Sequence, residues 1–203
     1  MNFRGSRVLL SLLVLVVAGC GDSSLNGKDV SHLMPALEFQ LTDQTGKAVD
    51  ERVFAGRPVA IYFGFTHCPD VCPMTLAKLA AASRALPEPL RESLQLAFVS
   101  VDPARDTPQR LTDYTAAFSD RMLGLTGTQQ QLQDLTRRYR VTYGYAEPDA
   151  EGQYEVSHSS AVWVFNRELE AELMLFDDLD IAQMADDLQR VLTQADEGVG
   201  AQG

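Results

Sequence analysis

The stretch of residues 59–76 restricts the fold of this chain more than any other. It begins with the apolar run Val59–Phe63, whose β-branched and aromatic side chains predict a strand that is buried on both faces. A helical pattern follows from Pro73, a residue type that suits the first turn of a helix. Cys68 and Cys72 lie between the two elements. Because open α/β sheets carry their chemistry at the carboxyl ends of strands, we interpret both thiols as functional groups.

The spacing of the two cysteines favours a chemical role over a structural one. A bridge between Cys68 and Cys72 closes a loop that is too small to stabilise a fold, but the pair can form a Cys68–Cys72 disulfide in an oxidising compartment. Cys72 falls at the predicted start of the helix, where the positive end of the helix dipole favours a thiolate.

Helical and strand patterns alternate along the rest of the chain, and a hairpin comes late. Thr107 and Thr128 each precede a helical pattern and are predicted to cap it. The sequence therefore predicts an α/β fold in which a mixed sheet is flanked by helices, in one domain. The expected strands are 37–41, 58–63, 94–101, 122–125, 141–145, 161–165 and 171–176, and the expected helices are 73–86, 108–118, 128–139 and 180–192.

The amino-terminal segment has the pattern of an export signal. Arg4 and Arg7 precede the uncharged run 8–18, which as a helix would span only about 16 Å of a hydrocarbon core about 30 Å thick. The residues before Cys20 resemble the bacterial lipobox, which implies cleavage at this cysteine and lipid on its thiol and amine. The alternative is an ordinary signal peptide that happens to contain a cysteine.

These patterns divide the chain into four parts. We expect a signal peptide over residues 1–19, a polar tether over 20–35, the folded domain over 36–194 and a disordered tail over 195–203. We also expect a monomer that is exported and held by its lipid on a membrane, facing the periplasm or the cell exterior. The net charge of -11 at pH 7 argues against nucleic acid as a partner.

A histidine is a candidate for a third soft ligand, and the alternative from spacing alone is an ordinary polar loop residue. His158 lies just before the apolar run 161–165, His67 adjoins Cys68, and His32 falls in the tether and is assigned no role. Two thiolates and one imidazole suit copper, Cu(I) above all, although zinc accepts the same ligands. We interpret His67 as a residue that forms hydrogen bonds in the thiol loop or lowers the thiol pKa, rather than as a ligand.

Three blocks of sequence together resemble the SCO/SenC family. The first is Phe63–Pro73, with the sequence Phe-Gly-Phe-Thr-His-Cys-Pro-Asp-Val-Cys-Pro, and the second is Ser100–Pro108. The third is the single His158 before the late hairpin. The resemblance extends over about residues 35–193 and implies a thioredoxin-like fold.

The resemblance also implies a function. It implies one copper ion per chain held by Cys68, Cys72 and His158, and a role in assembling the binuclear copper site of cytochrome c oxidase subunit II. Members of the family are described as copper chaperones, as thiol–disulfide reductants of that subunit's cysteines, or as both. Cys68 and Cys72 would be catalytic in the second interpretation. A thiol peroxidase is a third alternative.

The sequence departs from the family at the residue before the histidine. The family often has an acidic residue there, and this chain has Ser157. The second ring nitrogen of a metal-bound histidine usually needs an acceptor, and this role could fall to Asp70, Asp102 or a backbone carbonyl. Asp70 is otherwise a solvent-exposed residue, and Asp102 is otherwise a structural acceptor for loop amides.

Overall fold

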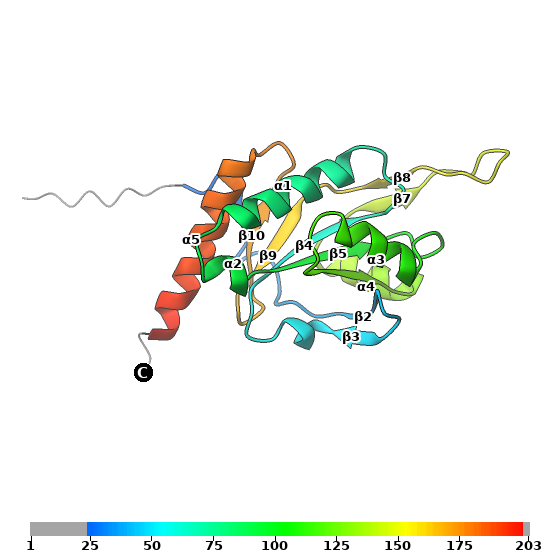
Figure 1. Ribbon diagram of the computed structural model, residues 1–203. Helices are drawn as coiled ribbons and strands as arrows, with labels where there is room; N and C mark the ends of the chain where they lie inside the picture. Colours follow the sequence, from blue (N-terminus) through cyan, green and yellow to red (C-terminus); the bar gives the residue numbers. More distant parts are fainter. Residues whose placement is uncertain (1–23, 201–203) are drawn as a thin grey trace, which may run out of the picture.

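Eight strands form the central sheet of the computed structural model, which describes residues 24–200 (Figure 1). In their order across the sheet, these strands are β1 (Lys28–Asp29), β10 (Ala171–Leu175), β9 (Val162–Phe165), β4 (Val59–Gly64), β5 (Gln95–Ser100), β6 (Met122–Thr126), β2 (Gln40–Asp43) and β3 (Ala48–Asp50). A separate two-stranded sheet pairs β7 (Tyr143–Tyr145) with β8 (Val156–His158). The helices are η1 (Glu51–Phe54), α1 (Val71–Ala85), α2 (Leu90–Ser93), α3 (Pro108–Ala116), α4 (Gln129–Arg138) and α5 (Ile181–Gly200).

The middle of the sheet confirms the predicted mixed α/β, thioredoxin-like fold. Strand β4 runs parallel to β5, β5 runs parallel to β6, and β9 runs antiparallel to β4. All six residues of β4 are buried, as its apolar sequence predicts. Gly64 pairs with Ser100, so the carboxyl ends of β4 and β5 lie side by side and bring the thiol loop next to the loop after β5.

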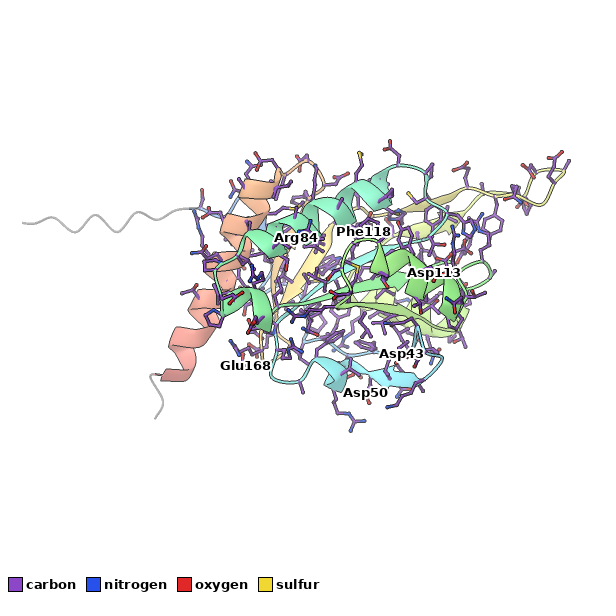
Figure 2. The ribbon with its side chains drawn as sticks, in the orientation of Figure 1. Asp43, Asp50, Arg84, Asp113, Phe118 and Glu168 are labelled. Atoms are coloured by element: carbon purple, nitrogen blue, oxygen red, sulfur yellow. The ribbon has the colours of Figure 1, made fainter. Side chains whose placement is uncertain are left out.

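Helices cover the sheet and begin where their capping residues predict. Helices α1 and α5 pack against each other (Figure 1). The side chain of Thr107 accepts the Arg110 N–H at the start of α3, and Thr128 forms a capping box with Gln131 at the start of α4. In Figure 2, Arg84 at the end of α1 lies next to Phe118, whose carbonyl accepts an N–H of Arg84.

The folded unit begins earlier than we expected. Strand β1 lies within the range assigned to the tether and pairs with the edge strand β10, and Val30 is only 1% exposed. The backbone N–H groups of Asn26 and Gly27 donate to the fully buried carboxylate of Asp187. Residues 26–35 are therefore part of the domain, because an open sheet edge and a buried acceptor hold a segment whose own sequence looks like a linker.

The carboxyl-terminal end also differs from expectation. Helix α5 continues to Gly200, so residues 195–200, which we expected to be disordered, have helical backbone. The reason is local, since no proline and no glycine interrupts the pattern before Gly198. The expected signal peptide, the lipid on Cys20 and residues 201–203 lie outside the described residues. Within the described range, none of the helices combines the length and the apolar character that crossing a bilayer requires.

Candidate metal centre

Strand β4 and helix α1 hold the two thiols. Cys72 is the second residue of α1 and is fully buried, whereas Cys68 in the preceding loop is 9% exposed. The Cys72 N–H donates to the Cys68 sulfur across 3.3 Å, and both cysteines are free thiols. Both thiols are therefore buried, Cys72 completely and Cys68 nearly so.

The absence of a side chain at Gly64 makes room for the inner sulfur. A Cβ atom at this position would lie 2.8 Å from the Cys72 sulfur and 3.1 Å from ring carbons of both Tyr62 and Phe98. A Cβ atom essentially never lies as close as 2.8 Å to an unbonded atom, and 3.1 Å is already a tight contact, so Cys72 can occupy its place only because residue 64 is glycine. The glycine that ends the strand thus also shapes the site.

The imidazole of His158 completes the cluster from the end of β8. Its Nε2 atom lies 3.0 Å from the Cys72 sulfur, and its Nδ1 atom lies 2.9 Å from the carbonyl oxygen of Ser159. Because a carbonyl only accepts, Nδ1 carries the proton and Nε2 presents its lone pair to the sulfur. A backbone carbonyl therefore fills the orienting role for which Asp70 and Asp102 were the other candidates.

Aromatic rings enclose the imidazole and control the protonation of the cluster. The rings of Tyr62 and Phe65 meet the His158 ring edge-on, with centroids 5.9 and 5.6 Å away. Burial lowers the pKa of His158 and raises the pKa of Cys72. Burial thus favours a neutral imidazole beside a protonated thiol in the metal-free site. Our expectation that the helix dipole would favour a Cys72 thiolate is wrong, because desolvation outweighs it.

The donor set fits a single soft metal ion. The two sulfurs and the imidazole nitrogen all lie within 4.8 Å of one another. With ligand bonds of about 2.0–2.3 Å, two donors of one ion are separated by at most about 4.6 Å. Small rotations of the side chains therefore suffice to bring Cys68, Cys72 and His158 onto a common centre.

The acidic residues of the second sequence block do not join this cluster. Asp106 accepts the Thr66 N–H at 2.8 Å, the Thr66 hydroxyl at 2.7 Å and the Ser100 hydroxyl at 2.5 Å. Asp102 accepts from a neighbouring arginine and tyrosine instead of from the imidazole. Hydrogen bonds within the protein therefore occupy both carboxylates.

The two remaining candidates lie at the rim of the site. His67 is exposed, and its Nδ1 atom lies 3.3 Å from Asp106. Asp70 is also exposed and stands before α1 without a capping hydrogen bond from its side chain. Sequence reasoning missed Tyr62, Phe65 and Gly64 as residues that shape the site. Their signal was their position at the end of the predicted strand and next to the thiol loop.

The fold and the cluster together define a class of protein. The chain has a thioredoxin-like fold with two thiols and one imidazole converging beside the carboxyl end of its central strand, which is an arrangement that could hold a metal ion. A family model described as SCO1/SenC matches residues 31–193. The chain belongs to the SCO1/SenC family.

Individual relatives agree with this assignment. The mitochondrial SCO2 homolog of Bos taurus is 41% identical over 130 residues, which are 64% of this chain and 49% of the relative. A protein of Stutzerimonas stutzeri named as a putative copper-binding protein is 40% identical over 122 residues, 60% of this chain and 59% of that one. The chain spans about half the length of the curated relatives that it matches first.

A solved structure shows the same fold. The crystal structure of Arabidopsis thaliana ScoI with copper bound superposes with a TM-score of 0.71 and 33% sequence identity. The similarity covers 78% of this chain and 98% of that chain.

Proposed function

We propose that the protein binds one copper ion through Cys68, Cys72 and His158 and delivers it during the assembly of cytochrome c oxidase. The observation that carries the proposal is the convergence of two thiols and one imidazole within 4.8 Å. The similar Stutzerimonas protein is named for copper binding, and the similar Arabidopsis structure holds copper, which supports the choice of metal. The binuclear copper site of subunit II is the recipient that we propose.

The chemistry of the donors favours Cu(I). Two thiolates and an imidazole are soft ligands, and the enclosed inner sulfur keeps water from competing for the ion. Copper must displace the proton from Cys72, so that binding releases a proton. Copper is the cargo in this proposal, and the site must therefore also give it up to another protein.

An anaerobic Cu(I) titration against a calibrated competing chelator tests the proposal. We expect one tight equivalent for the reduced protein and affinity at least tenfold weaker for His158→Ala, a loss of about 1.4 kcal/mol. His32→Ala is the matched control, because this exposed histidine lies in the turn after β1. Equal affinity in the wild-type protein and His158→Ala would refute the ligand set.

A second candidate function rests on the proximity of the two sulfurs. We propose as the alternative a thiol–disulfide oxidoreductase, in which Cys68 and Cys72 give two electrons and two protons to a partner's disulfide and become a disulfide themselves. The two sulfurs lie within 4.8 Å of each other, which favours it. Either serine variant should then abolish disulfide reduction, and His158→Ala should leave it largely intact.

The site can also be distinguished from a peroxidase. A thiol peroxidase needs one reactive thiolate, whereas burial raises the pKa of Cys72 and a histidine lies beside it. Rapid consumption of hydrogen peroxide by the reduced protein would support that third function. The absence of such consumption leaves copper delivery and disulfide reduction.

We propose further that the mature protein begins at Cys20 and is exported as a lipid-anchored monomer. The charged start, the short apolar run and the residues before Cys20 support this proposal. The net charge of -11 is consistent with a partner other than nucleic acid. Mass spectrometry of the expressed protein would show the lipid, and Cys20→Ser would remove it. An unmodified amino terminus that retains residues 1–19 would contradict the proposal.

A further inference from the structure

The strand that carries His158 is not part of the central sheet. Strands β7 and β8 pair only with each other among the described residues, and their connecting loop projects from the body of the molecule (Figure 1). The ladder that fixes β4 therefore does not fix His158. The position of the imidazole therefore depends in part on side chains that fasten this hairpin, residues 143–158, to the body.

Arg105, in the loop after β5, makes the most extensive of these contacts. Its Nε–H donates to Asp102 at 2.5 Å, and one of its Nη atoms donates to the carbonyl of Tyr154 at 3.1 Å. Its guanidinium carbon lies 3.7 Å from the centre of the Tyr154 ring. The Tyr154 hydroxyl donates to the other oxygen of Asp102 at 2.6 Å, so that the three residues form a closed ring of contacts.

This ring joins the loop after β5 to the hairpin by strong interactions. Asp102 is fully buried and the Arg105 side chain is 19% exposed, so their ion pair is screened little by solvent. Tyr154 stands four residues before His158, in the segment that leads into β8. A planar guanidinium that stacks on a ring and also donates hydrogen bonds cannot be replaced by lysine without loss.

The ring of Phe65 connects the Arg105 guanidinium to the His158 imidazole in a second way. The guanidinium lies 5.9 Å from the centre of the Phe65 ring, and the Phe65 ring lies 5.6 Å from the His158 ring. Phe65 belongs to the thiol loop and is buried. Arg105 therefore contacts both the hairpin that carries His158 and the ring that His158 packs against.

We propose that Arg105 and Tyr154 are positioning residues that hold His158 against Cys72. The proposal rests on the ligand role of His158 proposed above. Other contacts, such as the Tyr143 hydroxyl that accepts from Gln129 at 2.8 Å, also tie the hairpin down. Loss of Arg105 should therefore displace the hairpin without unfolding the protein, and it should act on copper only through His158.

A double-mutant cycle tests this dependence. We expect Arg105→Ala to weaken Cu(I) binding about tenfold where His158 is present, as the loss of outer contacts to a metal ligand typically does. In the His158→Ala background the same change should weaken binding less than about twofold. Arg138→Ala is the matched control, because Arg138 also lies over a tyrosine ring, at 6.0 Å from Tyr139, and pairs with a carboxylate, at 3.0 Å.

Hydrogen exchange of the metal-free protein gives a readout that does not depend on copper. The amides of residues 143–158 should exchange faster in Arg105→Ala than in the wild-type protein, and the amides of β4 and β5 should be unchanged. Unchanged exchange in the hairpin would overturn the proposal, and so would equal losses of copper affinity in both backgrounds. If the hairpin exchanges faster in Arg105→Ala but neither Arg105→Ala nor His158→Ala weakens Cu(I) binding, the role of Arg105 in placing the hairpin is upheld and the proposed ligand set is refuted.

A milder variant covers the case in which Arg105→Ala does not fold because Asp102 is left buried and unpaired. Tyr154→Phe removes only the hydroxyl that donates to Asp102 and keeps the ring under the guanidinium. It should raise exchange in the hairpin and weaken Cu(I) binding only where His158 is present. Wild-type exchange and wild-type affinity in this variant would overturn the proposal.

Discussion

Replacing Gly64 by alanine should damage the site and the core together. The added Cβ would lie 2.8 Å from the Cys72 sulfur and 3.1 Å from the rings of Tyr62 and Phe98. Unbonded heavy atoms attract at about 3.5–4.0 Å, so these neighbours must move by several tenths of an ångström or more. Both rings are buried, and overpacking of such a core costs about 1–3 kcal/mol.

Two assays measure the result. With about 2–4 °C lost per kcal/mol in a chain of this size, an overpacking free energy of about 2 kcal/mol should lower the melting temperature by about 4–8 °C. The Cys72 sulfur lies 3.0 Å from Nε2 of His158, and its displacement should weaken Cu(I) binding about tenfold. Thermal unfolding and chelator competition check the two effects.

A second glycine provides the control. A Cβ at Gly144 would meet its nearest neighbour, the Ser157 hydroxyl oxygen, at an ordinary 3.5 Å, and this residue also lies in a strand. Gly144→Ala should therefore leave melting temperature and copper affinity nearly unchanged. If Gly64→Ala keeps wild-type stability and affinity, the space around Cys72 is larger than the structure indicates and the steric reasoning is refuted.

Further predictions concern protonation and the amino-terminal segment. Burial raises the pKa of Cys72, so Cu(I) affinity should increase with pH, as chelator competition at several pH values will show; a flat profile would contradict proton release. Burial lowers the pKa of His158 in the folded protein below its ordinary value of about 6.5. Between the lowered pKa and about 6.5, the unfolded state binds more protons than the folded state, so the free energy of unfolding should fall as pH falls through this range. Urea unfolding at several pH values should show this slope in the wild-type protein, and His158→Ala should lose it. Asp187→Ala should lower the free energy of unfolding by about 1–3 kcal/mol and leave copper affinity unchanged. The control Asp186→Ala, at an exposed ion pair, should change the free energy of unfolding by less than about 1 kcal/mol.

Local signals predicted most of the fold. The apolar run of β4 needs only neighbouring residues to be recognised, and so do the caps at Thr107 and Thr128. Strand β1 has no such signal, because its residues Lys28 and Asp29 are both exposed and pair through backbone atoms alone. A two-residue strand of this kind is determined by the edge it joins rather than by its own sequence.

Some residues of the site could likewise be predicted from local sequence, and others could not. Cys68 and Cys72 are close in sequence and were recognised from the pattern around them, but His158 lies 86 residues beyond Cys72 and was selected through the family resemblance. The Ser159 carbonyl that orients the imidazole could not be identified in advance, because every residue offers the same backbone acceptor. The desolvation of Cys72 likewise depends on side chains that only the folded chain brings together.

The attachment of the amino-terminal segment has a mechanical consequence. The chain enters the described structure beside α5, away from the β7–β8 hairpin (Figure 1). A pull on the preceding residues would first load the hydrogen bond from Arg190 to the Ser24 carbonyl, then the three hydrogen bonds between Asp187 and residues 26–27, and then the short pairing of β1 with β10. These bonds can yield before strain reaches β4. We therefore expect tension on the preceding segment to break these peripheral contacts before it changes the geometry of the sulfur–imidazole cluster.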